Sequence, residues 1–136
     1  MEMIEIRYSI KPENWGGMAD ISGSWKDFEI LRQDILRFLE SDSESILINV
    51  DNNASSDGWE VVVESLELRQ NGDAVKVSVL ENKILKIEGS SQKLEIFAAW
   101  LEFDENTPSA YHSHYEYFEG NEFINSKSVP LVIRNK

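Results

Sequence analysis

Cysteine is absent from the sequence, which excludes disulfide bonds, thiolate zinc sites and thiol nucleophiles together. Long apolar runs are absent as well: the longest, Ile96 to Leu101, is far shorter than the roughly 20 residues that span a bilayer. The N-terminal residues, MEMIEIRYSI, include acids where a secretory signal carries bases. We therefore expect a single cytoplasmic domain over residues 1–136, with neither export nor membrane insertion.

Basic residues are scarce, with 13 Lys and Arg against 25 Asp and Glu, and the formal net charge is −12. Affinity for nucleic acids depends on clustered Lys and Arg that displace counterions, so we expect no nucleic-acid partner. A basic protein is the natural complement, although acidity also serves solubility alone. Two long stretches contain no base, Phe38 to Leu68 and Leu94 to Ser126. They would form one negative face if the fold brought them together.

Catalytic motifs are also lacking. The sequence has no GxSxG elbow and no phosphate-binding glycine motif, and it has only two histidines, both in one short segment. A catalytic triad therefore has no support. We expect no catalytic residue, no cofactor and no enzymatic activity.

One segment nevertheless holds potential metal ligands. In a strand, His112, His114 and Glu116 would point to one side at intervals of about 6.7 Å. Two imidazoles and a carboxylate are suitable ligands for zinc or a similar ion. Three ligands from one short strand cannot close a tetrahedron, and the nearest additional candidates are Asp104 and Glu119. We expect no metal site, and a small metal-dependent enzyme using these three residues stays open as an alternative.

The other side of the same segment would show tyrosines, because Tyr111, Ser113, Tyr115 and Tyr117 alternate with the potential ligands. Tyrosine supplies a large amphipathic contact area and is enriched in interface cores. A row of tyrosines beside acidic residues is therefore typical of a binding surface. The competing interpretation is a tyrosine face packed on the sheet or on a helix.

The first half of the chain alternates between strand and helix patterns. Period-2 alternation predicts a strand over Met3 to Ile10, and glycines with one proline predict a loop over Lys11 to Gly23. An apolar stripe at three-to-four spacing after the potential N-cap Ser24 predicts a helix that ends within Ser41 to Ser45. A second strand should follow over Ile46 to Val50.

The second half suggests an antiparallel meander and then a second helix. The Asn71-Gly72 pair is a strong hairpin signal, and Ser90 and Ser91 are potential caps for the helix. The expected strands are Trp59–Gln70, Ala74–Leu80, Ile84–Glu88, Tyr111–Phe118 and Val129–Ile133. The predicted fold is therefore α+β, with a mainly antiparallel sheet of five to six strands and two amphipathic helices packed on one face.

Five pieces of sequence are spread along almost the whole chain, from Ile4 to Ile133: IEIRYSIKPENWGGMADISGSW, KVSVLENKILKIEGS, LEIFAAWLEF, YHSHYEYFEGNEFI and VPLVI. In these segments the sequence resembles a family of predicted immunity proteins from bacterial polymorphic toxin systems. The most distinctive piece is HYEYFEGNE, from His114 to Glu122. Such families are described as α+β.

The resemblance implies a protein that binds and neutralises a cognate toxin domain and has no catalytic residues. A basic toxin, such as a nuclease, would suit an acidic inhibitor that steers it into contact. We expect Gly120 to permit a turn. A homodimer and an oligomerising scaffold subunit of unknown role stay open as alternatives. The residues expected to face the partner are Tyr111, Tyr115, Tyr117, Glu116, Glu119 and Asn121.

Overall fold

The computed structural model describes residues 4–9, 17–51, 61–80 and 83–136. Within these ranges the chain forms two helices, eight strands of at least four residues and one strand of two residues. The elements are β1 (Glu5–Ser9), β2 (Met18–Gly23), α1 (Trp25–Glu40), β3 (Ser45–Asn49), β4 (Val61–Val62), β5 (Ser65–Gln70), β6 (Lys76–Leu80), β7 (Ile84–Gly89), α2 (Ser91–Ala99), β8 (His112–Tyr115) and β9 (Leu131–Asn135).

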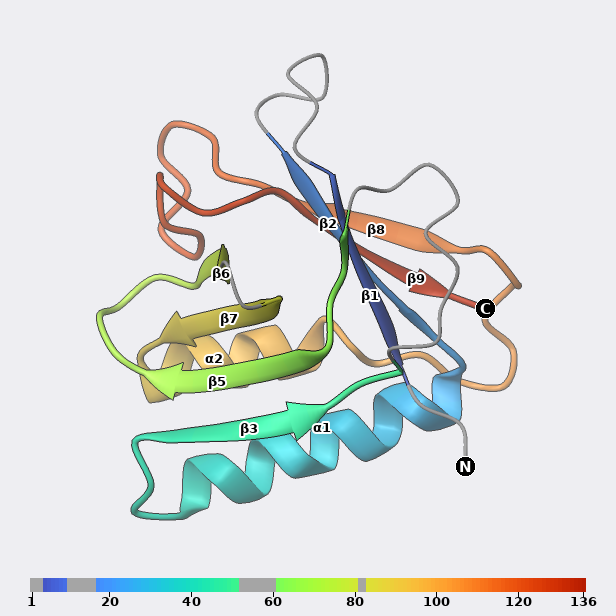
Figure 1. The fold of residues 1–136 in the computed structure, drawn as a ribbon, viewed down its shortest axis with the longest axis horizontal. Helices are drawn as coiled ribbons and strands as arrows, with labels where there is room; N and C mark the ends of the chain where they lie inside the picture. The colour runs from blue at the N-terminus through green and yellow to red at the C-terminus, as the bar shows by residue number, and fades with distance from the viewer. Residues whose placement is uncertain (1–3, 10–16, 52–60, 81–82) are drawn as a thin grey trace.

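The strands form two sheets that cross steeply in the view of Figure 1. The first sheet has the order β4-β1-β2-β9-β8, and the second has the order β3-β5-β7-β6. Both sheets are mixed, because β2 pairs in parallel with β9 and β5 pairs in parallel with β7, while the other pairs are antiparallel. The α+β class and the two helices are confirmed. The prediction of one sheet is only roughly right.

The helices begin where the sequence predicts, because their caps are local. The Ser24 hydroxyl accepts a hydrogen bond from Asp27 N, and the Asp27 carboxylate accepts one from Ser24 N, which makes a capping box. Ser90 caps α2 by accepting from Lys93 N. The helix α1 ends at Glu40, just before the predicted Ser41 to Ser45 segment.

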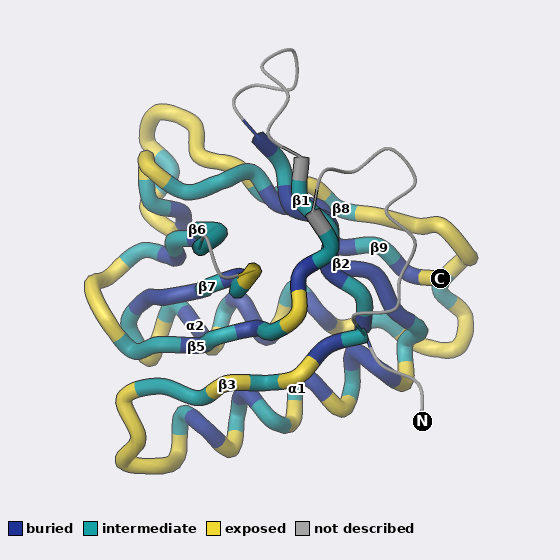
Figure 2. Tube along the Cα trace, in the orientation of Figure 1, coloured by how far each residue is buried: buried dark blue, intermediate teal, exposed yellow. Residues whose placement is uncertain are grey.

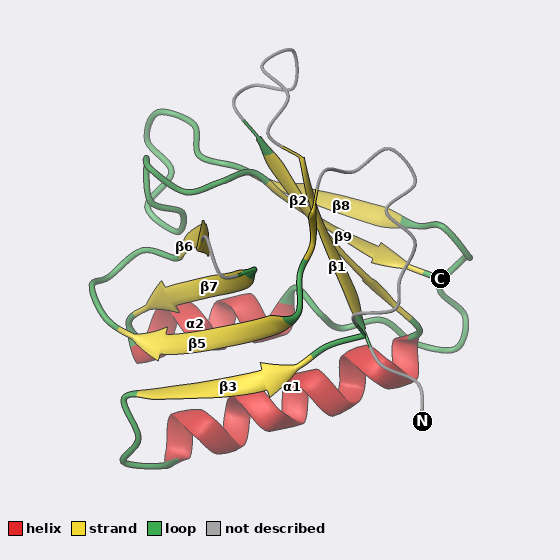
Figure 3. Cartoon of the chain, in the orientation of Figure 1, coloured by secondary structure: helices red, strands yellow, loops and turns green. Residues whose placement is uncertain are grey.

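One hydrophobic core connects both sheets and both helices. The helices pack against each other, with α1 running along β3 and α2 behind β5 and β7 (Figure 3). The buried residues of strands and inner helix turns appear as dark blue in Figure 2. The fully buried side chains that join these layers include Ile6, Ile21, Phe28, Leu66, Ile87 and Phe97. No helix in the described ranges is long and apolar enough to cross a membrane.

The predicted loop over Lys11 to Gly23 is wrong in its last part. Residues Met18–Gly23 form β2, which lies between β1 and β9 in the first sheet, and residues 10–16 lie outside the described part. Asp20 in this strand is fully buried, and its Oδ2 accepts hydrogen bonds from the Arg134 guanidinium at 3.0 and 3.2 Å. An unpaired buried carboxylate is costly, so β2 depends on a partner 114 residues away in the chain.

The predicted meander is half right. The strands β6 and β7 form the expected antiparallel hairpin, with Lys83 in the turn between them, but the Asn71-Gly72 turn does not pair β5 with β6. The chain instead crosses the end of β7, where Asn71 N donates to Gly89 O and Ser90 N donates to Asp73 O. It thereby reaches the far side of β7, and β5 pairs with β7 in parallel. Residues 81–82 lie outside the described part.

The single strand predicted over Trp59 to Gln70 divides between the sheets. Val61–Val62 is β4 in the first sheet, and Ser65–Gln70 is β5 in the second. At the junction, Val63 N donates to Ile6 O and Glu64 N donates to Lys83 O. Strands that change sheets in this way form the corners between two sheets. Residues 52–60, including the start of the predicted strand, lie outside the described part.

Candidate binding surface

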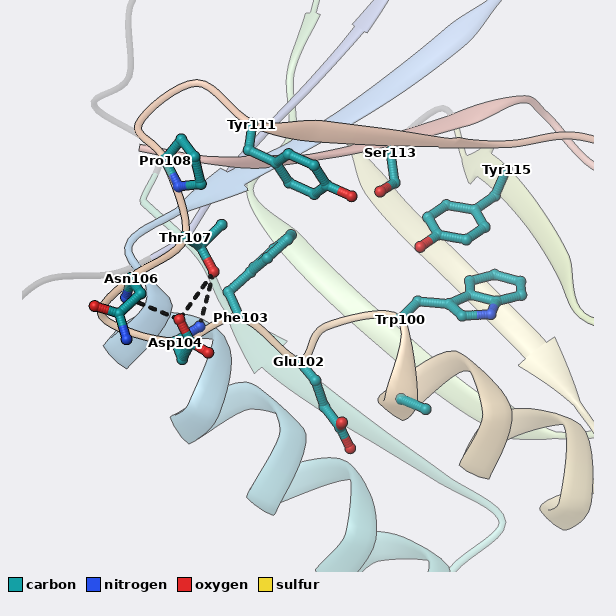
Figure 4. Close-up of a pocket in the computed structure, with 11 residues that line it drawn as sticks. Trp100, Glu102, Phe103, Asp104, Asn106, Thr107, Pro108, Tyr111, Ser113 and Tyr115 are labelled. Atoms are coloured by element: carbon teal, nitrogen blue, oxygen red, sulfur yellow. Dashed lines mark hydrogen bonds between the residues drawn. The ribbon is translucent and has the colours of Figure 1, made fainter.

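The strand β8 is the outer strand of the first sheet, and it lies opposite the C-terminal end of α2. Between them is an open pocket of about 550 Å³, which we call the aromatic cleft (Figure 4). Tyr111, Ser113 and Tyr115 extend into it from the β8 side, as the period-2 pattern predicts. The opposite side consists of the segment that follows α2. The residues that define the cleft here are Trp100, Glu102, Phe103, Asp104, Tyr111, Ser113 and Tyr115.

Ring contacts pair the two sides of the cleft. Tyr115 stacks on Trp100 with a centroid distance of 4.1 Å and an interplanar angle of 11°. Tyr111 meets Phe103 edge to face at 6.0 Å. Phe103 also contacts the buried Phe28 of α1 at 5.1 Å. The aromatic rings of the cleft are therefore anchored in the hydrophobic core. The interpretations of the tyrosines as a binding surface and as a packed face both hold in part, because Tyr115 is packed while Tyr111 is half exposed.

The surroundings of Tyr115 raise the pKa of its phenol. Burial in the cleft raises its pKa above the usual value, a hydrogen bond with Ser113 lowers it, and the proximity of Tyr111 raises it further. The net shift is upward. At neutral pH this group is a neutral hydroxyl that can donate one hydrogen bond.

The polar rim of the cleft is fixed by short-range hydrogen bonds. Asp104 N donates to the Thr107 hydroxyl at 3.0 Å, and Asn106 N donates to Asp104 Oδ1 at 2.8 Å. The Asn135 carboxamide of β9 donates to the carbonyls of Thr107 and Pro108, each at 3.1 Å. The rim is thus tied to the first sheet, which holds the cleft open in one geometry.

The chain after β8 exposes large side chains. Tyr117 is 40%, Phe118 65% and Phe123 41% exposed, and Tyr111 before the strand is 50% exposed. Glu116, Glu119 and Glu122 beside them are exposed carboxylates. This exposed segment, residues 116–123, begins directly at the end of β8 and carries four of the six residues predicted to face a partner.

Asn121 has an internal role in this segment. Its Nδ2 donates to Glu116 O at 3.3 Å, and its Oδ1 accepts from Phe123 N at 2.9 Å. The carboxamide is therefore engaged in shaping the loop, and contact between Asn121 and a partner stays a prediction. Gly120 has φ +91° with no atom within 4 Å of an added Cβ, so its predicted role as a turn residue is confirmed.

The structure brings some predicted residues together and adds others. Tyr111 and Tyr115 share the aromatic cleft, whereas Tyr115, Glu116 and Asn121 also line a smaller pocket of about 220 Å³ at the end of β8. Tyr117 and Glu119 lie beyond both pockets. The sequence analysis did not identify Trp100, Phe103, Phe118 and Phe123 as surface residues. The signal for Trp100 and Phe103 was the run of aromatic residues around the end of α2, which resembles an ordinary apolar helix face. The signal for Phe118 and Phe123 was their place in the acidic segment that follows β8.

The histidines lie on the side of β8 away from the cleft. The His112 and His114 rings meet edge to face at 5.0 Å, and His112 Nδ1 lies 3.2 Å from Ala110 O. Glu116 follows the end of β8, so the strand alternation does not extend to it. Within residues 4–9, 17–51, 61–80 and 83–136, no group of three His, Asp or Glu side chains is placed to hold a metal ion.

The acidic turn after α1 lies apart from the second base-free stretch. The turn after α1, with Glu40, Asp42 and Glu44, is at the lower left of Figure 1, whereas residues 101–111 lie at the right and residues 116–128 at the upper left. Asp57 and Glu60 lie outside the described part. Glu40, Asp42 and Glu44 therefore do not extend the surface around β8. The carboxylates that line the cleft, Glu102 and Asp104, belong to the second stretch.

No protein-family model matches this chain, and comparisons with curated proteins and with solved structures found no significant match.

Proposed function

We propose that this chain is a binding protein that neutralises a basic bacterial toxin domain, such as a nuclease, by direct complex formation. It is not proposed to catalyse a reaction. The sequence resemblance to predicted immunity proteins suggests that the partner is a toxin. The surface around β8 is the physical basis proposed for binding it.

The observation that carries this proposal is the exposure of large side chains in an acidic segment. Tyr111, Tyr117, Phe118 and Phe123 are each at least 40% exposed, and no Lys or Arg occurs from Leu94 to Ser126. Phe118 and Phe123 line the same smaller pocket at the end of β8, whereas Tyr111 lies at the other end of the strand. Exposed aromatic residues that lie close together, as Phe118 and Phe123 do, are typical of interaction sites. Carboxylates around them favour a basic partner and accelerate its association.

The alternative of a metal-dependent enzyme has less support. His112 and His114 are adjacent, but the third potential ligand, Glu116, lies past the end of the strand. Two imidazoles leave the first shell of a structural or catalytic zinc site incomplete. An oligomerising scaffold has no observation that favours it over a complex with a toxin.

The proposal is tested by co-expression with the product of the neighbouring upstream gene. We expect that product to arrest growth when expressed alone, and to be harmless and co-purify when this chain is present. A neighbour that is neither toxic nor bound overturns the proposal.

A matched pair of variants tests the surface. The double substitution Tyr117→Ser and Phe118→Ser should abolish protection, because it removes exposed aromatic contacts. The control is Ile30→Ser with Leu47→Ser, on α1 and β3, which changes side chains that are 57% and 59% exposed. The control should protect fully. Loss of protection in the control but not in the first variant contradicts the assigned surface.

A further inference from the structure

We propose that the aromatic cleft is a receptor site for one arginine side chain that projects from the partner protein. This inference deepens the proposed function and rests on it for the source of the side chain. It assigns a ligand chemistry to Tyr111 and Tyr115, which the sequence analysis treated only as general contact surface, and to Trp100 and Phe103, which it did not identify.

Ring surfaces line both sides of the cleft. The pair Tyr111 and Phe103 lies at one end of the cleft, the pair Tyr115 and Trp100 lies at the other end, and Ser113 lies between them on β8 (Figure 4). The face of an aromatic ring carries negative electrostatic potential and attracts a cation within about 6 Å of its centroid. A planar guanidinium can stack on such a face and still donate hydrogen bonds at its edges.

The charges around the cleft select a cation. Glu102 and Asp104 line it, and none of its described lining residues is basic. Glu102 Oε1 is 3.9 Å from Arg32 Nη1, but Arg32 is bound more closely by Glu29, at 2.8 Å, and the Glu102 side chain is 63% exposed. The Glu102 carboxylate is therefore available to a further cation.

The geometry favours arginine over lysine. The cleft has a volume of about 550 Å³ and is open to solvent on one side. It can therefore admit the broad, planar guanidinium of arginine, and it is not closely fitted to the compact ammonium of lysine. Guanidinium is also more weakly hydrated than ammonium, so it loses less hydration free energy when it enters an aromatic site. The Ser113 and Tyr115 hydroxyls can accept from its N–H groups. The rings are held in place by Phe28 and by the contact of Trp100 with Phe97 at 5.7 Å.

The test uses a capped tripeptide, acetyl-Gly-Arg-Gly-amide, and the same peptide with citrulline, which has the same shape without the charge. Each peptide is titrated into the isotope-labelled full chain and followed by two-dimensional NMR. We expect saturable shifts of the Trp100 indole N–H and the Ser113 amide with the arginine peptide. The citrulline peptide should bind at least about 5-fold more weakly.

Variants locate the site. Tyr111→Ala removes a half-exposed ring and should weaken arginine-peptide binding by about 3-fold to 5-fold. Glu102→Gln removes one carboxylate and should weaken it by about 2-fold to 3-fold. Leu47→Ala, on β3 and 59% exposed, is the control and should bind like the unmodified chain.

The inference is overturned if neither peptide shifts the cleft signals, if both bind equally, or if Tyr111→Ala binds as well as the control. None of these measurements involves the toxin. Failure of the cleft therefore leaves the co-expression result unaffected, and failure of the co-expression test is seen separately as an absence of toxicity or binding.

Discussion

Glu88 is a buried carboxylate at the end of β7, with an exposed fraction of 7%. Burial raises its pKa, but the hydrogen bond from Asn71 Nδ2 at 2.9 Å and the charges of Lys86 and Lys76 lower it more, so the net shift is downward. A carboxylate with a lowered folded-state pKa stabilises the fold above its unfolded pKa of about 4.3, and this contribution is lost as the pH falls through the folded value.

Asn71→Ala should therefore lower the free energy of unfolding by about 1 kcal/mol at pH 7, because the buried charge loses its hydrogen-bond donor. The difference should shrink as the pH falls through the lowered folded-state pKa of Glu88, because the carboxyl group then becomes protonated. Urea denaturation of the unmodified chain and of Asn71→Ala at pH 7 and pH 3 measures this difference in the free energy of unfolding. The titration of the other acids affects both proteins equally and cancels in the difference. In a Glu88→Gln background the pH dependence of the difference should disappear. An unchanged difference at both pH values contradicts this account.

At the scale of elements, the crossing of residues 71–75 over the end of β7 decides the order of the second sheet. A Cβ added at Gly89 would lie 3.3 Å from Asp73 O and 3.5 Å from Val75 Cα. Both atoms belong to the backbone, so neither can move without displacing the crossing segment. The absence of a side chain at Gly89 therefore favours the close crossing that places β6 outside β7.

We expect Gly89→Ala to destabilise the fold by about 1 kcal/mol. The added methyl group crowds a close backbone contact, and this cost is larger than the gain from the lower conformational entropy of the unfolded chain. Hydrogen exchange of the Asn71 and Ser90 amides, which bond across the crossing, should accelerate. Gly72→Ala is the comparison: its φ is +73° and no atom lies within 4 Å, so it strains the turn alone. Gly89→Ala with unchanged exchange at both amides contradicts the role of the crossing.

At the scale of the whole molecule, the net charge of −12 matters less than its distribution. The acids of the second base-free stretch surround the cleft and the exposed segment, while Glu40 and Asp42 lie at a distant corner. Electrostatic steering acts over about one Debye length, roughly 30 Å at 0.01 M salt and 10 Å at 0.1 M. Association with a basic partner should therefore depend on which acids are near the interface.

For the toxin identified by co-expression, the association rate should fall at least about 10-fold between roughly 0.01 M and 0.1 M salt, with a smaller change in dissociation. Glu116→Gln with Glu119→Gln should slow association several-fold at low salt. Glu40→Gln with Asp42→Asn changes the net charge equally, from −12 to −10 (−12 + 2), and should slow it less. Surface plasmon resonance measures both rates, and equal effects of the two variants would place the interface elsewhere.

The sequence by itself determined the features that depend on near neighbours. The capping box joins Ser24 and Asp27, three residues apart, and the apolar stripe that follows it fixes the buried face of α1. Alternation in residues 3–10 likewise predicts β1 and, in residues 111–117, places Tyr111 and Tyr115 on one side of β8. These signals are local because hydrogen bonding in a helix and side-chain direction in a strand repeat over a few residues.

Only the tertiary structure decided which strands pair and where the cleft forms. In the sequence, Asp20 and the nearby glycines indicate a loop. In the structure this segment is the strand β2, because Arg134, 114 residues away, bonds the Asp20 carboxylate. The Asn71-Gly72 turn indicates a hairpin until Gly89 lets the chain cross β7. The aromatic cleft unites Trp100 and Phe103 after α2 with Tyr111 and Tyr115 of β8. The physical reason is that strand partners and facing side chains are chosen by burial against distant segments.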